Sequence, residues 1–102
     1  NVGELLMLVT SELGEALEAH QKGRHAYWDN YSGFDLKSEF SPECFDPSSF
    51  AVNIKDTFED EIADAVIRLL DLAAGLNIDL ELHINAKVEF NKTRERLHGK
   101  QY

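Results

Sequence analysis

Apolar residues spaced as on one face of a helix limit the possible folds of this chain more than any other feature. In the first segment they recur at steps of three and four, the period of an amphipathic helix. These residues are Val2, Leu5, Leu6, Val9, Leu13, Ala16 and Leu17. We predict a helix from near residue 2 to about Gln21, with Gly23 as its stop signal.

Two further helices are predicted in the second half of the chain. The segment FEDEIADAVIRLLDLAAGL carries an apolar stripe and has Gly75 as its stop, and we expect Ser49 or Asp56 to cap its start. Asp79 is the expected cap of a third helix that runs to about Leu97, with a stripe at Leu80, Ile84 and Val88. Because the connection between them is short, these two helices are expected to form an antiparallel hairpin.

Residues 24–50 follow no single period. They contain both prolines, clustered Ser, Asp, Gly and Asn, and most of the aromatic residues. A loop of this length within a domain is usually either functional or disordered, and the aromatic residues argue against disorder. We therefore expect a packed excursion, with one short helical turn near residues 35–40.

The fold class that follows is all-α. A length of 102 residues supports one domain, residues 1–102, and no alternating strand pattern occurs. Three helices leave wide apolar stripes uncovered. The prediction is therefore that helical hairpins pack as a four-helix-bundle-like core that is completed by homo-oligomerisation, most simply as a twofold dimer.

The charge balance argues against two classes of partner. Ten Lys and Arg face 19 Asp and Glu, a net charge of −9, so neither nucleic acid nor an anionic membrane is expected to bind. No apolar run approaches the roughly 20 residues of a membrane span, and no signal-peptide pattern opens the chain. The lone Cys44 fits a reducing cytoplasm. The chain starts at Asn1, already within the helical pattern, so we expect residues to precede it.

Two pairs of acidic residues form the candidate metal site. Glu12 and Glu15 make an ExxE pair on the first helix, and Glu61 and Asp64 make an ExxD pair on the second. Residues three apart share a helix face, so packing of the two helices would bring four carboxylates around one space. Their repulsion favours a hard divalent ion, Mg²⁺ or Mn²⁺, over Zn²⁺. The alternative is that these residues belong to solvated helix faces.

A basic row on the third helix is the candidate phosphate-binding element. Lys87, Asn91 and Arg94 lie at steps of four and three, hence on one face, and such groups suit a phosphate chain. The alternative is a solvated basic stripe. Lys100 and Tyr102, near the chain end, would extend the same binding surface or fray. No Gly-rich phosphate loop, CxxC or HExxH motif offers another chemistry.

These motifs, in this order, resemble those of the MazG-like nucleoside triphosphate pyrophosphohydrolases, of the all-α NTP pyrophosphatase superfamily. The matching stretches are SELGEALEA, EDEIADAVIRLLDLA and KxxxNxxR followed by HGKQY. The resemblance implies Mg²⁺-dependent hydrolysis of a (d)NTP to the monophosphate and pyrophosphate. It implies metal binding by both acidic pairs, phosphate binding by the basic row, and a four-helix core built by dimers or dimers of dimers. The gap between Glu15 and Glu61 is longer than usual in the family.

Two roles and two competing functions stay open at this point. Trp28 or Tyr31 is a candidate to stack on the nucleobase, and the alternative is an aromatic plug over the bundle. Glu12 or Glu15 is the candidate base that activates the attacking water. A dUTPase-like or dCTPase-like relative would keep the same fold. A non-catalytic acidic dimer that binds a partner or a structural metal is the alternative of a different class.

Overall fold

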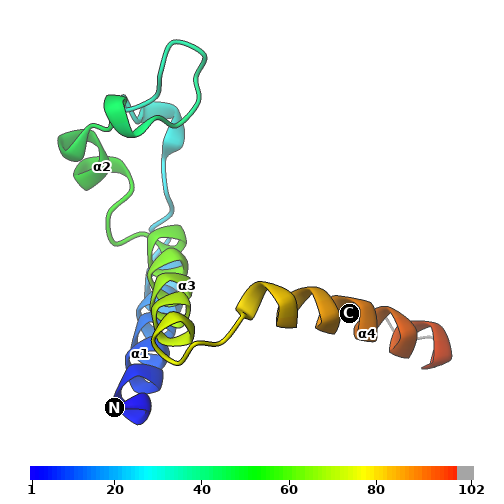
Figure 1. The fold of residues 1–102 in the computed structure, drawn as a ribbon. Helices are drawn as coiled ribbons and strands as arrows, with labels where there is room; N and C mark the ends of the chain where they lie inside the picture. The colour runs from blue at the N-terminus through cyan, green and yellow to red at the C-terminus, as the bar shows by residue number, and fades with distance from the viewer. Residues whose placement is uncertain (99–102) are drawn as a thin grey trace. The chain divides into compact units, whose positions relative to one another are not determined.

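The described part of the chain, residues 1–98, is mainly helical in this computed structural model (Figure 1). Its elements are α1 (Val2–Gln21), the 3-10 helices η1 (Trp28–Asn30) and η2 (Pro42–Cys44), α2 (Pro47–Asn53), α3 (Phe58–Gly75) and α4 (Leu80–His98). The prediction of an all-α fold is confirmed. No helix within residues 1–98 has the length and apolar character needed to cross a membrane. The chain divides into two compact units, Asn1–Leu69 and a second from Leu70 onward.

Helix α1 begins and ends where its apolar periodicity predicts. Gly23 follows it with a φ of 71°, a left-handed conformation that glycine adopts without steric penalty. The Gly23 amide then bonds to the His20 carbonyl at 3.0 Å, and the Arg24 amide bonds to the Ala19 carbonyl at 2.8 Å. This pair of bonds is a Schellman motif, which satisfies the last carbonyl groups of the helix.

Helix α3 is capped by a residue that the sequence did not single out. The Thr57 hydroxyl accepts a hydrogen bond from the Asp60 amide at 3.3 Å, in the position of an N-cap. The expectation that Ser49 or Asp56 caps this helix is wrong. Asp56 takes a left-handed φ of 62° and donates its own amide to the Asp60 carboxylate, whereas Ser49 lies within the separate helix α2.

The turn between α3 and α4 combines two local signals. Gly75 is the last residue of α3, as expected, but the left-handed residue is Asn77, with a φ of 58°. Asparagine tolerates this conformation better than most residues because its side chain bonds locally. Asp79 caps α4 as predicted, accepting a hydrogen bond from an amide of the first turn at 3.1 Å. The antiparallel packing of α3 and α4 stays a prediction.

The helical turn expected near residues 35–40 is wrong. The Asp35 carboxylate instead accepts hydrogen bonds from the amides of Lys37, at 2.8 Å, and Glu39, at 3.0 Å. The turn that they form is closed by an isolated antiparallel bridge between Phe34 and Phe40. Aspartate competes in this way with helical hydrogen bonds, which explains why the local pattern gave no true helix.

Helix α2 was not predicted, although its start carries a recognisable signal. Asp46 is the N-cap, accepting the Ser49 amide at 3.1 Å, and Pro47 occupies the first helical position. Ser32 fastens the rest of the excursion to this helix: its hydroxyl donates to Asp46 at 2.6 Å and its amide donates to the Ser49 hydroxyl at 3.0 Å. The excursion is thus held by its own polar contacts.

An aromatic cluster fills the middle of the excursion. The ring of Tyr31 lies edge-on to those of Trp28 and Phe34, with centroids 5.3 and 5.1 Å apart. Tyr31 is only 5% exposed. Gly33 leaves the room for this arrangement, because a Cβ atom there would overlap the Tyr31 ring.

The substitution Gly33→Ala is expected to loosen this cluster. Overpacking of this kind destabilises by about 1–3 kcal/mol, so the melting temperature should fall and the fluorescence of Trp28 should shift. Gly14→Ala is the matched control, since Gly14 is exposed in the middle of α1 with nothing within 4 Å of the added atom. The free energy of unfolding of Gly14→Ala should rise by roughly 0.5–1 kcal/mol, because alanine has the higher helix propensity. An unchanged Trp28 spectrum and melting temperature in Gly33→Ala would contradict the packing described.

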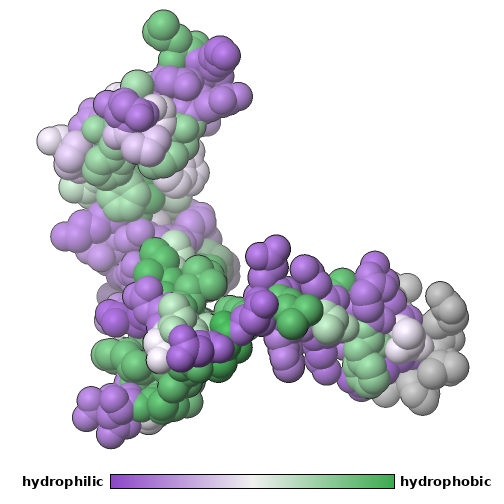
Figure 2. Space-filling model, viewed as in Figure 1, coloured by the Kyte–Doolittle hydropathy of each residue, from purple (hydrophilic) through white to green (hydrophobic). Residues whose placement is uncertain are grey.

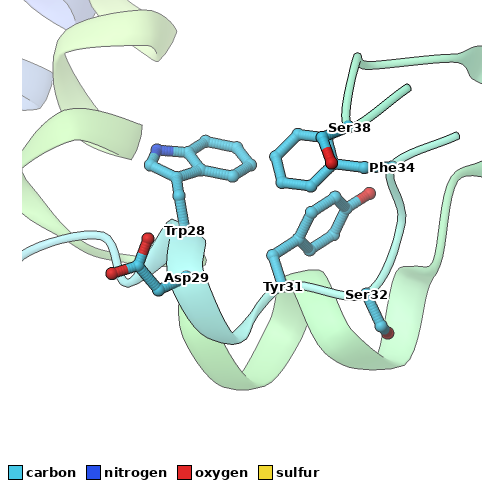
Figure 3. A pocket seen from close by; sticks show the side chains of 6 residues that line it. All are labelled: Trp28, Asp29, Tyr31, Ser32, Phe34 and Ser38. Atoms are coloured by element: carbon cyan, nitrogen blue, oxygen red, sulfur yellow. The ribbon is translucent and has the colours of Figure 1, made fainter. Parts of the chain in front are cut away.

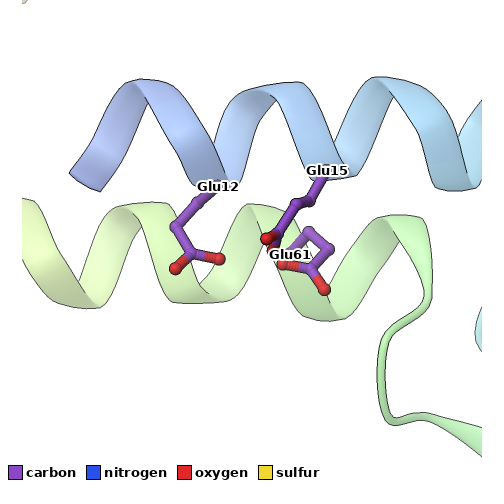
Figure 4. Close-up of side chains that lie close together, drawn as sticks. All are labelled: Glu12, Glu15 and Glu61. Atoms are coloured by element: carbon purple, nitrogen blue, oxygen red, sulfur yellow. The ribbon is translucent and has the colours of Figure 1, made fainter. Parts of the chain in front are cut away.

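Helix α1 lies antiparallel beside the part of α3 that ends at Leu69 (Figures 1 and 4). Small side chains bring the two helices together, since the buried apolar residues along this pair are Val9, Ala16, Ala19 and Ala65. Larger apolar residues stay exposed beside them and form what we call the apolar face: Leu6, Leu13, Leu17, Ile62, Val66 and Leu69. Figure 2 shows apolar side chains gathered over this pair, toward the start of α1.

Candidate metal centre

Three of the four predicted acidic residues converge between α1 and α3. One carboxylate oxygen from each of Glu12, Glu15 and Glu61 lies within 4.8 Å of the others. Glu12 and Glu15 extend from α1 toward Glu61 on α3 (Figure 4). Their convergence follows from the sequence, because the spacing of three places both α1 carboxylates toward the seam that Glu61 also faces.

The cluster is partly withdrawn from water. Glu61 is 6% exposed and Glu12 is 9% exposed, whereas Glu15 lies at the open side. The Oε2 atom of Glu61 is buried and has no hydrogen-bond partner among the described residues. Leaving a buried carboxylate oxygen unpaired is unfavourable, and such an atom calls for a proton or a cation.

Burial and repulsion leave the cluster with a bound proton. Burial first, and then the neighbouring carboxyl groups of Glu12 and Glu15, together raise the pKa of Glu61 from 4.5 to about 8. The pKa of Glu12 is lowered, first by its interaction with the Glu61 carboxyl group and also by Arg68, against the opposing effect of burial. The two shifts favour a proton held within this pair of carboxyl groups, with Glu61 binding it more readily than Glu12.

Arg68 is a member of the site that the sequence reasoning missed. Its Nε atom donates to the Oε1 atom of Glu12 at 3.0 Å, from α3 to α1. Its spacing in the sequence could have indicated that Arg68 lies near the acidic residues. Arg68 follows Asp64 by four residues and Glu61 by seven, which keeps all three on one helix face. Arg68 offsets part of the negative charge of the cluster from the side of Glu12.

Asp64 lies near the cluster but outside the group of three converging carboxylates. It is half-buried on α3. Burial raises its pKa, and the negative charges of Asp60 and Glu12 raise it further. The influence of Glu12 on this pKa shows that Asp64 belongs to the same electrostatic environment as the three glutamates.

The residues present fit a hard divalent cation. Carboxylate oxygens from two helices are the ligands that Mg²⁺ and Mn²⁺ prefer, and the orphaned Oε2 atom of Glu61 provides an unused one. Glu12, Glu15 and Glu61 would hold such an ion, with Asp64 beside them. Mg²⁺ keeps several waters in most protein sites, so three or four carboxylates suffice.

The basic row lies on α4, in the second unit. The Nζ atom of Lys87 is 5.0 Å from the centroid of the Phe90 ring, and the guanidinium carbon of Arg94 is 5.9 Å from it. These contacts place both cations on one helix face, as their spacing predicts, and Asn91 is half-buried. That this row faces the carboxylates stays a prediction. Lys100 and Tyr102 lie outside the described residues.

The candidate base-stacking residues line a cavity of their own. Trp28, Asp29, Tyr31, Ser32, Phe34 and Ser38 surround a cavity of about 430 Å³ in the excursion (Figure 3). Trp28 is half-exposed, whereas Tyr31 is covered by its neighbours. Of the two, Trp28 keeps the accessible ring that stacking on a base requires.

Comparisons with protein-family models, with curated proteins and with solved structures give no match for this chain. Its class is therefore defined by its own fold and site. It is an all-helical chain with a partly buried cluster of carboxylates between two antiparallel helices.

Proposed function

We propose that this chain is a Mg²⁺-dependent nucleotide pyrophosphohydrolase, which cleaves a (d)NTP between the α and β phosphates. The observation that carries the proposal is the buried Oε2 atom of Glu61, which has no partner among the described residues and lies in a cluster of three carboxylates. The basic row of α4 and the resemblance to MazG-like enzymes support the choice of a phosphate substrate.

Each group of candidate site residues has its own role in the proposed reaction. Glu12, Glu15, Glu61 and Asp64 hold the cation, which when bound withdraws charge from the phosphoryl oxygens. Lys87, Asn91 and Arg94 bind the phosphate chain, and Trp28 or Tyr31 contacts the base. Glu12 or Glu15 takes the proton of the attacking water. Glu15 is the better candidate, because Glu12 is already bound to Arg68 and its pKa is lowered.

The same proposal includes a homodimer with a four-helix core. Helices α1 and α3 bury mainly small side chains against each other and leave the apolar face exposed. Two helices alone bury too little apolar surface for stability, whereas two such pairs would cover both faces. The free thiol of Cys44 is exposed, and we propose the reducing cytoplasm as the compartment.

The test is the identity of the products. The protein is incubated with each (d)NTP and Mg²⁺ or Mn²⁺, and the products are resolved by ion-exchange chromatography. We expect monophosphate and pyrophosphate, and we expect EDTA to abolish their formation. Diphosphate with phosphate would contradict cleavage between the α and β phosphates. Absence of products with every nucleotide would favour the non-catalytic dimer instead.

A further inference from the structure

A small hollow lies against the open side of the carboxylate cluster. Its volume is about 290 Å³, and it is lined by Glu15, Glu18, Arg24, Asp56 and Glu61. Arg24 is the single cation among these lining residues. A phosphate group bound to a metal ion between carboxylates needs a positive charge on its side away from the metal. Arg24 is the residue of this hollow that can supply such a charge.

The backbone of Arg24 is held at both ends of the residue. Its amide donates to the Ala19 carbonyl at 2.8 Å, and its carbonyl accepts the amide of Phe58 at 2.9 Å. The first bond belongs to the end of α1 and the second to the start of α3. The Cα atom of Arg24 is therefore fixed relative to the two helices that carry the carboxylates.

The guanidinium group of Arg24 keeps its hydrogen-bonding capacity. It forms no ion pair within 4 Å among the described residues, although four acidic residues line the same hollow. One of these four, Glu18, is paired with Lys22 at 2.7 Å. Lys22 lowers the pKa of Glu18 and the charge of Arg24 helps to lower it, but among the described residues the guanidinium group of Arg24 forms no direct ion pair.

A second hollow extends from the same residue. It has a volume of about 400 Å³, shares Arg24 and Asp56 with the first, and is also lined by Lys55 and Tyr27. Arg24 therefore lies where the space beside the carboxylates meets a space that offers a further cation and a half-exposed aromatic ring.

We propose that Arg24 binds a phosphate group of the substrate, as the anion-binding residue on the excursion side of the metal centre. The inference rests on the proposed function, since it requires a phosphate held at the cation of Glu15 and Glu61. A guanidinium group offers two parallel donors to phosphate oxygens, which a fixed Cα atom can aim. Lys55 also lines the second hollow and adds a second positive charge there.

Binding of inorganic pyrophosphate to the Mn²⁺-loaded protein tests the inference. By calorimetry, Arg24→Gln should weaken this affinity by about 10- to 100-fold, the effect of losing a charged hydrogen bond. Mn²⁺ affinity in the absence of pyrophosphate should stay within about twofold of wild type. Lys37→Gln removes the same charge from the exposed turn of the excursion and should leave both affinities unchanged.

Three other results of these binding measurements would contradict the role proposed for Arg24. Equal pyrophosphate affinity in Arg24→Gln and wild type would overturn it, as would a parallel loss of Mn²⁺ binding, which would make Arg24 a structural residue. Failure of wild type to bind pyrophosphate would also overturn it. The proposed function is judged separately. If the protein hydrolyses nucleotides and Arg24→Gln binds pyrophosphate as well as wild type, only the inference about Arg24 is wrong. If pyrophosphate binding depends on Arg24 but no nucleotide is hydrolysed, only the proposed function is wrong.

Discussion

The variant Glu61→Gln is expected to lose catalysis and to gain stability. Glutamine keeps the shape of the side chain but cannot supply an anionic ligand, so turnover should fall by about 10³-fold, the equivalent of roughly 4 kcal/mol. In the metal-free protein the same change removes a carboxyl group that burial disfavours as an anion. We therefore expect a higher melting temperature in EDTA.

The sign of the stability change follows from the pKa of Glu61. Folding raises this pKa from 4.5 to about 8, so the folded state favours the protonated form. The stabilisation that this proton gives is complete below pH 4.5 and is lost as the pH rises through about 8. Glutamine mimics the protonated form at every pH, and its advantage should therefore appear only as the pH increases.

Thermal unfolding at two pH values measures this effect. At about pH 9 in EDTA, a gain of even about 1 kcal/mol would raise the melting temperature by roughly 4–8 °C, and at about pH 4 the gain should vanish. Glu39→Gln is the matched control, because Glu39 is exposed on the excursion. Mn²⁺ should stabilise wild type but not Glu61→Gln. Full activity of Glu61→Gln would remove the metal centre from the proposal.

The second large effect is expected at the apolar face. Leu13 is 50% exposed on α1, and in the proposed dimer it would be buried against the partner copy. Leu13→Asp would place a charge in that interface twice, once for each copy, so the dissociation constant should rise by at least about 100-fold. Sedimentation velocity should then show a dimeric wild type and a monomeric variant with a lower melting temperature.

A matched substitution separates dimer loss from a general effect of added charge. Leu36 is fully exposed at the turn of the excursion, away from the α1–α3 pair. Leu36→Asp should leave the sedimentation coefficient and the melting temperature as in wild type. A wild-type protein that sediments as a monomer and still unfolds cooperatively would contradict the proposed four-helix core.

The parts of the fold that sequence predicted are those set by local periodicity. Helix α1 and the Asp79 cap of α4 depend on residues within one or two turns of each other, so the pattern alone locates them. The convergence of Glu12, Glu15 and Glu61 needed one more assumption, that the two long helices pack. That assumption was sufficient because both acidic pairs border an apolar stripe.

The parts that sequence missed depend on contacts between distant residues or on competition at short range. Arg68 meets Glu12 across the helix pair, and its spacing alone does not distinguish this contact from solvent exposure. Helix α2 is only seven residues long, too short for a period to show. The Asp35 turn is a side-chain effect that overrides helix propensity.

The hydrogen bond between the Arg24 carbonyl and the Phe58 amide joins the start of the excursion to the first residue of α3. The intervening chain is thus a closed loop, anchored beside the carboxylate cluster by this bond and by the bonds that His25 and the Ala26 amide make to the Glu59 carboxylate. The entropy needed to close such a loop grows only slowly with its length. Segments of different size and composition can therefore connect the same two helix ends without moving Glu12, Glu15 or Glu61. In the proposed enzyme, the excursion would thus be free to change substrate selectivity while the three carboxylates keep their positions.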